Sequence, residues 1–314
     1  MKKFNCRILV TGCGGDIGQS IGKILNESVS EVYGMDISDK NAGKFIYKNF
    51  SIGVRCTDEN YLSKLTQFIT ENQIDYVIPI AEPELRFLSK NKMLDNIGGA
   101  KLITASSKAL EIGFDKLKTS QFLMKNELPF PETRNINEVD KVVNYPVILK
   151  SKTGSGSTDV YKVMDDETFQ FLKRTNPDFI VQEYLEEKQG EFTCGVFKSI
   201  NGDVRTMILK RELTGGYSGY GEVVEDDMIN QLLISIANKL NLTGSINVQL
   251  RLTSNGPIVF EINPRFSSTV LFRHLFEFED LIWSIEEAMK VSLSPYQSNA
   301  IGKKFYKGFN EYIL

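Results

Sequence analysis

The 314-residue sequence is poor in the residues that hold zinc, with a single histidine, His274, and only four cysteines. The cysteines are widely spaced and form no C-x-x-C pair: Cys6, Cys13, Cys56 and Cys194. A zinc site built from cysteine and histidine is therefore effectively excluded. Reduced thiols in a cytoplasmic protein are the simplest expectation.

An excess of either charge is also missing. Charged residues make up 25% of the chain and the formal net charge is −3, which gives no electrostatic basis for binding nucleic acid or a membrane surface. No apolar run reaches the ~20 residues of a membrane-spanning helix, and no signal peptide opens the sequence. Internal repeats and low-complexity tracts are absent. We therefore expect a soluble cytoplasmic protein, long enough for two or three domains.

The N-terminal segment combines short apolar runs with a glycine-rich turn. Residues 7–11 read R-I-L-V-T, G-C-G-G-D-I-G follows at once, and residues 17–25 show helical periodicity. A second apolar strand then ends at Asp36, so the segment predicts the opening of a Rossmann-like unit. The spacing of its glycines resembles the cofactor fingerprint of extended short-chain dehydrogenases and nucleotide-sugar epimerases: Gly12, Gly15 and Gly18. A tight turn needs glycine for steric reasons alone, so NAD binding stays an alternative.

Two acidic residues follow a later strand of the same region. A helix is expected from about 58 to 72 and a strand over 76–80, after which come Glu82 and Glu84. Open α/β sheets bind ligands at the carboxyl ends of their strands, so these glutamates could meet a cationic substrate group. Glutamates in this position also cap the next helix or face water, and both interpretations stay open.

The most informative stretch is residues 244–265, which read G-S-I-N-V-Q-L-R-L-T-S-N-G-P-I-V-F-E-I-N-P-R. Apolar and polar residues alternate on both sides of a Ser-Asn-Gly-Pro turn, which predicts a β-hairpin. The period of two places Gln249 on one face of the first strand, and Glu261 and Asn263 together on one face of the second. Their oxygens suit Mg²⁺ shared with phosphate, and Arg265 could hold a transferring phosphoryl group. An edge hairpin with a solvated polar face would show the same pattern.

The hairpin resembles the metal-binding hairpin of the ATP-grasp superfamily. E-I-N-P-R after a strand with V-Q-L is most similar to the carbamoyl-phosphate-synthase-like branch of that family. The resemblance implies ATP as the cofactor, and it places the metal, Mg²⁺ or alternatively Mn²⁺, on Gln249, Glu261 and Asn263. It also implies that Arg265 contacts phosphate. Serines stand directly after N-P-R-F, where members of the family often have glycine.

Two lysines lie where the family grips a triphosphate. Lys150 ends a predicted strand and precedes the loop T-G-S-G-S-T, a combination of charge, backbone N–H groups and mobility that suits a polyphosphate. The loop is not a Walker A motif, because no G-K-[ST] follows the glycines. By resemblance, Lys116 in the helix D-K-L-K-T and Lys150 approach the ATP phosphates. The flap over them would be formed by Ser155, Gly156 and Ser157.

The hinge of the family corresponds to V-Q-E-Y-L at residues 181–185. The resemblance implies that the adenine binds along Glu183, Tyr184 and Leu185. It further implies that Glu191 takes the ribose hydroxyls, and that Lys210 or Arg211 reaches the γ-phosphate. Tyr184 and Lys188 also match the catalytic pair of the epimerases, but a β-rich run is unsuited to a pair one helical turn apart.

The resemblance implies an α/β fold, α+β in its C-terminal part, with a Rossmann-like N-terminal domain followed by a two-subdomain ATP-grasp fold. We expect domains at residues 1–110, 111–186 and 187–314. The implied function is a ligase in which Mg-ATP phosphorylates a small carboxylate and an amine attacks the acyl phosphate. The alternatives are an NAD-dependent nucleotide-sugar epimerase or dehydrogenase, and a non-catalytic ATP-binding regulatory protein. Arg273 could clamp a substrate carboxylate, residues 215–221 could form a loop that acts as a lid, and the sequence leaves a homodimer open.

Overall fold

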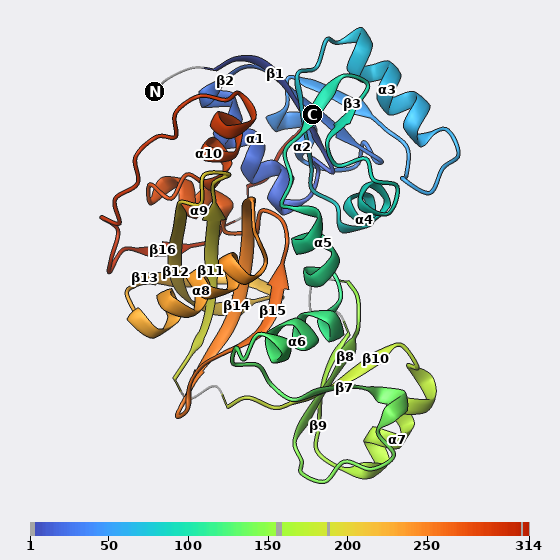
Figure 1. Ribbon diagram of the computed structural model, residues 1–314. Helices are drawn as coiled ribbons and strands as arrows, with labels where there is room; N and C mark the ends of the chain where they lie inside the picture. The colour runs from blue at the N-terminus through green and yellow to red at the C-terminus, as the bar shows by residue number, and fades with distance from the viewer. Residues whose placement is uncertain (1–3, 155–158, 187–188, 309, 314) are drawn as a thin grey trace.

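The computed structural model describes residues 4–154, 159–186, 189–308 and 310–313. Over these residues the chain forms three sheets with helices packed against them (Figure 1). The predicted mixed α/β class is confirmed. No helix in the described ranges is long and apolar enough to cross a membrane.

The first sheet has the strand order β3-β2-β1-β4-β6-β5 and is parallel except for the β5–β6 pair. Its strands are β1 (Phe4–Thr11), β2 (Val29–Asp36), β3 (Asn49–Ile52), β4 (Tyr76–Pro79), β5 (Asn96–Ile97) and β6 (Ala100–Leu102). Its helices are α1 (Asp16–Ser28), α2 (Gly43–Ile46), α3 (Tyr61–Glu71) and α4 (Glu82–Lys90). Ile8, Leu9 and Val10 of β1 are all fully buried, because helices cover both faces of the sheet. The assignment of this region as Rossmann-like stays a prediction.

The second sheet is antiparallel, with the order β7-β10-β8-β9. Its strands are β7 (Thr133–Asn135), β8 (Val147–Ser151), β9 (Val160–Val163) and β10 (Phe179–Glu183), and it is accompanied by the short η1 (Ile136–Glu138) and by α7 (Asp166–Thr175). Leu149, Val163 and Phe169 form its small separate core. Two helices, α5 (Ser107–Gly113) and α6 (Lys116–Lys125), run between the first and second sheets (Figure 1).

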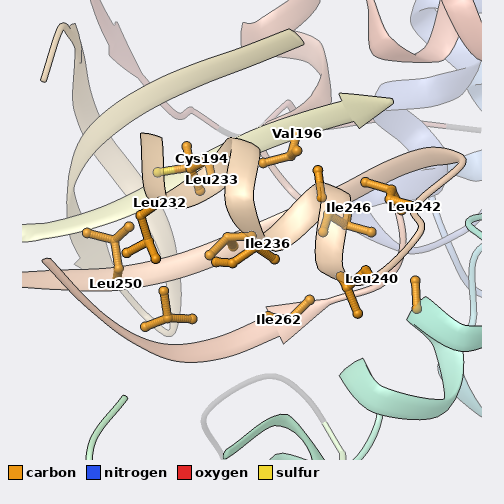
Figure 2. Packing of buried hydrophobic residues seen from close by; sticks show 14 of the residues in the cluster. Cys194, Val196, Leu232, Leu233, Ile236, Leu240, Leu242, Ile246, Leu250 and Ile262 are labelled. Carbon is orange, nitrogen blue, oxygen red and sulfur yellow. The ribbon is translucent and has the colours of Figure 1, made fainter. Parts of the chain in front are cut away.

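The third sheet has the order β15-β14-β11-β12-β13-β16. Its strands are β11 (Glu191–Lys198), β12 (Val204–Thr214), β13 (Tyr217–Val224), β14 (Gly244–Thr253), β15 (Gly256–Asn263) and β16 (Lys304–Tyr306). Helix α8 (Asp227–Lys239) packs on one face, where Leu233 and Ile236 contact alternate residues of β11 and β14 (Figure 2). The other face is covered at one end by α9 (Val270–Leu275) and α10 (Asp280–Ala288). Its opposite end is left open, and there the polar side chains of the strands face a cleft.

Residues 215–221 are not the loop that the sequence predicts. Strand β12 runs to Thr214 and β13 begins at Tyr217, so a tight β-hairpin replaces the loop. Gly215 and Gly216 occupy its turn with φ of +58° and +88°, which is the backbone of a type I′ turn. The glycines therefore mark a turn between two strands. Near the end of the described chain, β16 adds to this sheet by pairing with β13.

Candidate active site

A cleft of about 910 Å³ lies where residues from all three sheets meet. The first sheet contributes the carboxyl ends of β1, β2 and β4, the second contributes β8 and β10, and the third contributes the polar face of β11, β14 and β15. The residues that line it come from positions as far apart in the sequence as Thr11 and Ser268. The cleft is large enough for a nucleotide together with a small second substrate.

The hairpin β14–β15 brings the predicted metal ligands together. Gln249 is the register partner of Glu261, and Asn247 is the partner of Asn263. A β-bulge at Phe260 shifts the register between this end and the turn, and all five residues line the cleft. The prediction that alternation would place Gln249, Glu261 and Asn263 on one face is confirmed.

The donor set suits a divalent cation that is shared with another ligand. Within the described ranges no group of three or more His, Cys, Asp or Glu side chains could hold a metal. The hairpin instead offers one carboxylate, Glu261, and the amide oxygens of Gln249 and Asn263. Mg²⁺ is commonly held by one or two carboxylates, with water and substrate phosphates completing its octahedron. These residues therefore fit Mg²⁺ in the presence of a triphosphate.

Lys150 is a buried cation on β8. Only 6% of the residue is exposed, and burial lowers the pKa of its ammonium to about 8, while the charge of Glu261 opposes this shift. Its Nζ lies 5.5 Å from the centre of the Phe260 ring. Lys116 begins α6, and its Nζ donates to the carbonyl of Gly154 at 2.7 Å. Both lysines line the cleft. The predicted flap residues lie outside the described part of the chain: Ser155, Gly156 and Ser157.

Glu191 is held between two arginines. One carboxylate oxygen accepts from Arg211 Nη2 at 2.7 Å, and the other accepts from Arg251 Nη2 at 2.9 Å. Arg211 Nη2 also donates to Gln249 Oε1 at 3.0 Å, which links the pair to the hairpin. A ribose hydroxyl at Glu191 would therefore share a carboxylate that already makes two ion pairs. The sequence interpretation did not single out Arg251, although the same alternation places it beside Gln249.

Lys210 and Arg211 lie on opposite faces of β12. Arg211 pairs with Glu191 across the sheet and lines the cleft. Lys210 pairs with Phe192 and Glu222, is exposed, and does not line the cleft. Adjacent residues of a strand point to opposite faces. Of the two cations that the sequence left open, the structure places only Arg211 in position to meet a phosphate.

Two of the three residues predicted for the hinge after β10 lie at the cleft. Glu183 and Leu185 line the cleft, and the Leu185 carbonyl accepts from Arg251 Nη1 at 2.7 Å. Tyr184 does not line it, and its ring instead lies 4.0 Å from Lys162 Nζ. Tyr184 follows a strand and is not part of a helix, so the helical arrangement that an epimerase pair requires does not form at Tyr184.

Arg265 follows the hairpin directly and lines the same cleft. Burial lowers the pKa of its guanidinium, and the carboxylates of Glu82 and Glu261 oppose that shift. Its Nη1 donates to the carbonyl of Phe266 at 3.0 Å, which fixes the side chain near the chain turn. Arg265 thus lies between the metal-ligating end of the hairpin and the first sheet.

Residues 114–269 match the family model of the ATP-grasp domain. The chain contains an ATP-grasp domain. A carbamoyl phosphate synthase large chain from Saccharolobus islandicus is 24% identical over 316 residues, which cover 90% of this chain. The match spans only 29% of that relative, so this chain corresponds to less than a third of it.

Two solved structures share the fold around the ATP-grasp domain. An N5-carboxyaminoimidazole ribonucleotide synthetase in its ADP complex superposes with a TM-score of 0.76 and 17% identity, covering 95% of this chain and 80% of that one. An L-amino acid ligase from Bacillus licheniformis gives a TM-score of 0.68 and 19% identity, covering 91% and 75%. The structural likeness extends beyond residues 114–269 into the first sheet.

The glycine turn that precedes the ATP-grasp domain is closed by an acidic residue. Asp36 Oδ2 accepts from the backbone N–H of Gly14 at 2.8 Å, and Asp16 adds a second carboxylate in the first turn of α1. The Gly14 N–H is thus already occupied, and the two carboxylates would repel a pyrophosphate. Gly18 is required for packing, because a Cβ there would lie 2.6 Å from the Cα of Cys13. Gly18 is thus accounted for by close packing and Gly12 by its φ of +70°, whereas a Cβ at Gly15 would meet only ordinary contacts.

The glutamates after β4 reach the cleft from the first turn of α4. Glu82 forms an ion pair with Arg86 at 2.6 Å and accepts from the N–H of Gly154 at 3.3 Å. Glu84 is 8% exposed and accepts hydrogen bonds from Tyr61 Oη at 2.6 Å and Thr11 Oγ1 at 2.5 Å. The two residues lie in the first turn of the helix and also line the cleft, and their meeting a cationic substrate group stays a prediction.

Arg273 does not line the cleft beside the ATP-grasp hairpin, contrary to the suggestion that it clamps a substrate carboxylate. Its side chain is fully buried and pairs with Asp280 at 3.2 Å. Helix α9 directs it against Gly195 of β11 and the Phe278 ring. A substrate could not reach it without unfolding this packing. His274 also lies away from the cleft, 3.5 Å from Glu279.

Proposed function

We propose that this protein is an ATP-dependent ligase that joins a small carboxylate to an amine and releases ADP and phosphate. The observation that carries the proposal is the meeting of the Glu261 hairpin, Lys150, Arg211 and Arg265 in one cleft. More than half of the residues that line this cleft belong to the region that matches the ATP-grasp domain. A ribonucleotide synthetase and an amino acid ligase are among the proteins of similar structure, which agrees with ligation.

The reaction would proceed through an acyl phosphate. An oxygen of the carboxylate substrate attacks the γ-phosphorus of ATP, and the bond between that phosphorus and the β–γ bridging oxygen breaks. The amine nitrogen then attacks the carbonyl carbon, and the carbon–oxygen bond to phosphate breaks. No nucleophilic side chain is required, so catalysis rests on positioning and on neutralising charge.

The charged residues would divide this work by position. Lys116 and Lys150 would hold the phosphates from the second-sheet side, and Arg211 from the third sheet. Arg265 would lie beside the transferring phosphoryl group, because it follows the hairpin and faces the first sheet. Mg²⁺ held by Gln249, Glu261 and Asn263 would neutralise the triphosphate and polarise its terminal phosphate.

The adenosine would lie along the hinge after β10. Glu183 and Leu185 line this part of the cleft and could bind the adenine edge through their backbone groups. Glu191 would meet the ribose, with Arg211 and Arg251 holding its carboxylate in place. We place the domain boundaries at residues 1–110, 111–186 and 187–314. We also infer a cytoplasmic location, where free thiols such as those of the four unpaired cysteines persist.

Hydroxylamine tests the mechanism directly. The protein would be incubated with Mg-ATP, hydroxylamine and each of a panel of amino acids and simple carboxylic acids. Attack of hydroxylamine on an acyl phosphate yields a hydroxamate, with one ADP and one phosphate for each product. Release of AMP and pyrophosphate instead would indicate an acyl adenylate and would reject the acyl phosphate. The absence of any nucleotide turnover across the panel would favour a non-catalytic ATP-binding protein.

A further inference from the structure

The cleft is divided electrostatically between its two ends. The end formed by the second and third sheets is lined by five cations, Lys116, Lys150, Arg211, Arg251 and Arg265, which outnumber its four carboxylates, Asp159, Glu183, Glu191 and Glu261. Among the described residues that line the end formed by the first sheet, Arg55 is the one cation, against four carboxylates: Asp16, Asp36, Glu82 and Glu84. A triphosphate belongs at the first of these ends. The second end favours a ligand that carries positive charge.

Three of the four carboxylates already have cationic or backbone partners. Asp16 pairs with Lys307 at 2.5 Å, Glu82 pairs with Arg86, and Asp36 accepts from backbone N–H groups. Glu84 differs, because its two hydrogen-bond donors are the neutral hydroxyls of Tyr61 and Thr11. Among the residues that the structure describes, no cation pairs with it. A carboxylate has about four acceptor positions, so two remain for a ligand in the cleft.

We propose that the first-sheet end of the cleft binds the amine substrate as its ammonium ion, and that Glu84 takes the proton that activates it. This inference rests on the proposed ligase function. The substrate class would be a primary amine that is protonated at neutral pH, such as an amino acid or a diamine. A phosphorylated amine would be disfavoured, because its charge has the same sign as that of the surrounding carboxylates.

Amide formation requires a base that removes a proton from the ammonium ion. An ammonium nitrogen has no lone pair, so it must lose one proton before it attacks a carbonyl carbon. Glu84 would accept this proton and later release it to solvent. The neutral amine then attacks the acyl phosphate, and the departing phosphate carries away the second proton as the amide forms. Histidine cannot serve here, because the single His274 does not line the cleft.

The surroundings of Glu84 fit this role. Burial raises the pKa of its carboxyl group, which brings its basicity closer to that needed for proton exchange near neutral pH. Burial and the adjacent Glu84 also raise the pKa of Tyr61, so its hydroxyl stays protonated as a donor. Thr11 and Tyr61 are therefore positioning residues, which hold the carboxylate at the carboxyl ends of β1 and β4.

A substrate panel provides the first test. ADP release would be measured with Mg-ATP, the twenty common amino acids, putrescine and spermidine, and separately with phosphorylated amines such as glucosamine 6-phosphate and O-phosphoethanolamine. The inference expects stimulation by unphosphorylated amines. Turnover only with phosphorylated amines would leave the ligase function intact and overturn the amine site. No turnover with any compound would reject both.

The variant Glu84→Gln separates proton transfer from structure. Hydroxylamine is mostly uncharged at neutral pH and needs no base, so Glu84→Gln should keep hydroxamate formation within about threefold and lose amide formation by 100-fold or more. Tyr61→Phe keeps the carboxylate and should lower the rate with the amine by about tenfold. Glu59 is exposed and lies two residues before Tyr61. The variant Glu59→Gln is therefore the matched control and should leave both rates unchanged.

An equal loss of both products in Glu84→Gln would show that Glu84 only supports the fold, and would overturn the inference. Amide formation by Glu84→Gln at the wild-type rate would also overturn the inference. Folding of each variant would be checked by the increase in melting temperature on adding Mg-ATP, which reports an intact nucleotide site.

Discussion

Replacing Lys150 with methionine should make the unliganded protein more stable while it disrupts the proposed nucleotide site. The side chain is almost fully buried on β8, and burial lowers its pKa from 10.5 to about 8. A change of 2.5 pKa units corresponds to about 3 kcal/mol, which is the cost of keeping the ammonium charged in the folded protein. Methionine fills similar space without charge, so Lys150→Met should recover most of that free energy.

The stability gained in Lys150→Met should decrease as the pH rises. Because the folded pKa lies below the unfolded one, the cost is present in full below about pH 8 and is relieved as the pH rises toward 10.5. The advantage of Lys150→Met should therefore decrease from about 3 kcal/mol near pH 7 to about 1 kcal/mol near pH 9.5. For the same reason, the affinity of the wild type for ATP should fall above about pH 8, where Lys150 loses its charge.

Thermal unfolding measures both effects. Near neutral pH without nucleotide, Lys150→Met should melt about 5 °C above the wild type, and Lys141→Met, an exposed control in the same part of the chain, within about 1 °C of it. Saturating Mg-ATP should reverse the order, because only the wild type gains binding free energy. A lower melting temperature for unliganded Lys150→Met would refute the argument that burial of this charge is costly.

Three further predictions concern single residues. Glu261→Gln should abolish ADP release without lowering the melting temperature, since it removes the only carboxylate of the predicted metal site; wild-type turnover would show that the metal assignment is wrong. Arg211→Met should lower turnover at least tenfold whereas Lys210→Met should not, because only Arg211 lines the cleft; steady-state kinetics would compare them. Asp280→Asn should destabilise the fold by ~3 kcal/mol, measured by chemical unfolding, because it leaves Arg273 buried without a counter-charge; an unchanged midpoint would contradict this.

The sequence alone was sufficient for the features that depend on local periodicity. The alternation of apolar and polar residues over 244–253 determines which face of β14 is buried against α8 and which face meets the cleft. The same period places Glu261 and Asn263 on one side of β15, and the Ser-Asn-Gly turn brings the two strands together. Side-chain direction in a strand is a property of neighbouring residues, so no distant contact is needed to predict it.

Local patterns were misleading where one composition fits two structures. Glycines at 215 and 216 suggested an open loop, yet their positive φ angles form the turn of a hairpin. The glycines at 12, 15 and 18 suit either a cofactor turn or close packing, and the structure shows a packing requirement at Gly18. Composition gives the conformations that are available, and only the neighbouring chain selects among them.

Tertiary structure decided which charges are available for chemistry. Thr11 and Glu84 are 73 residues apart, and Glu191 is 60 residues from Arg251, so no short-range pattern predicts either contact. Arg273 looks like a ligand in sequence, but the packing of α9 and α10 buries it against Asp280. The residue type determines whether a side chain can carry a charge, whereas strand order and helix packing determine its burial and its partners. The sequence thus determined which residues carry groups suited to a nucleotide and a metal, and the fold determined which of them face the same cleft.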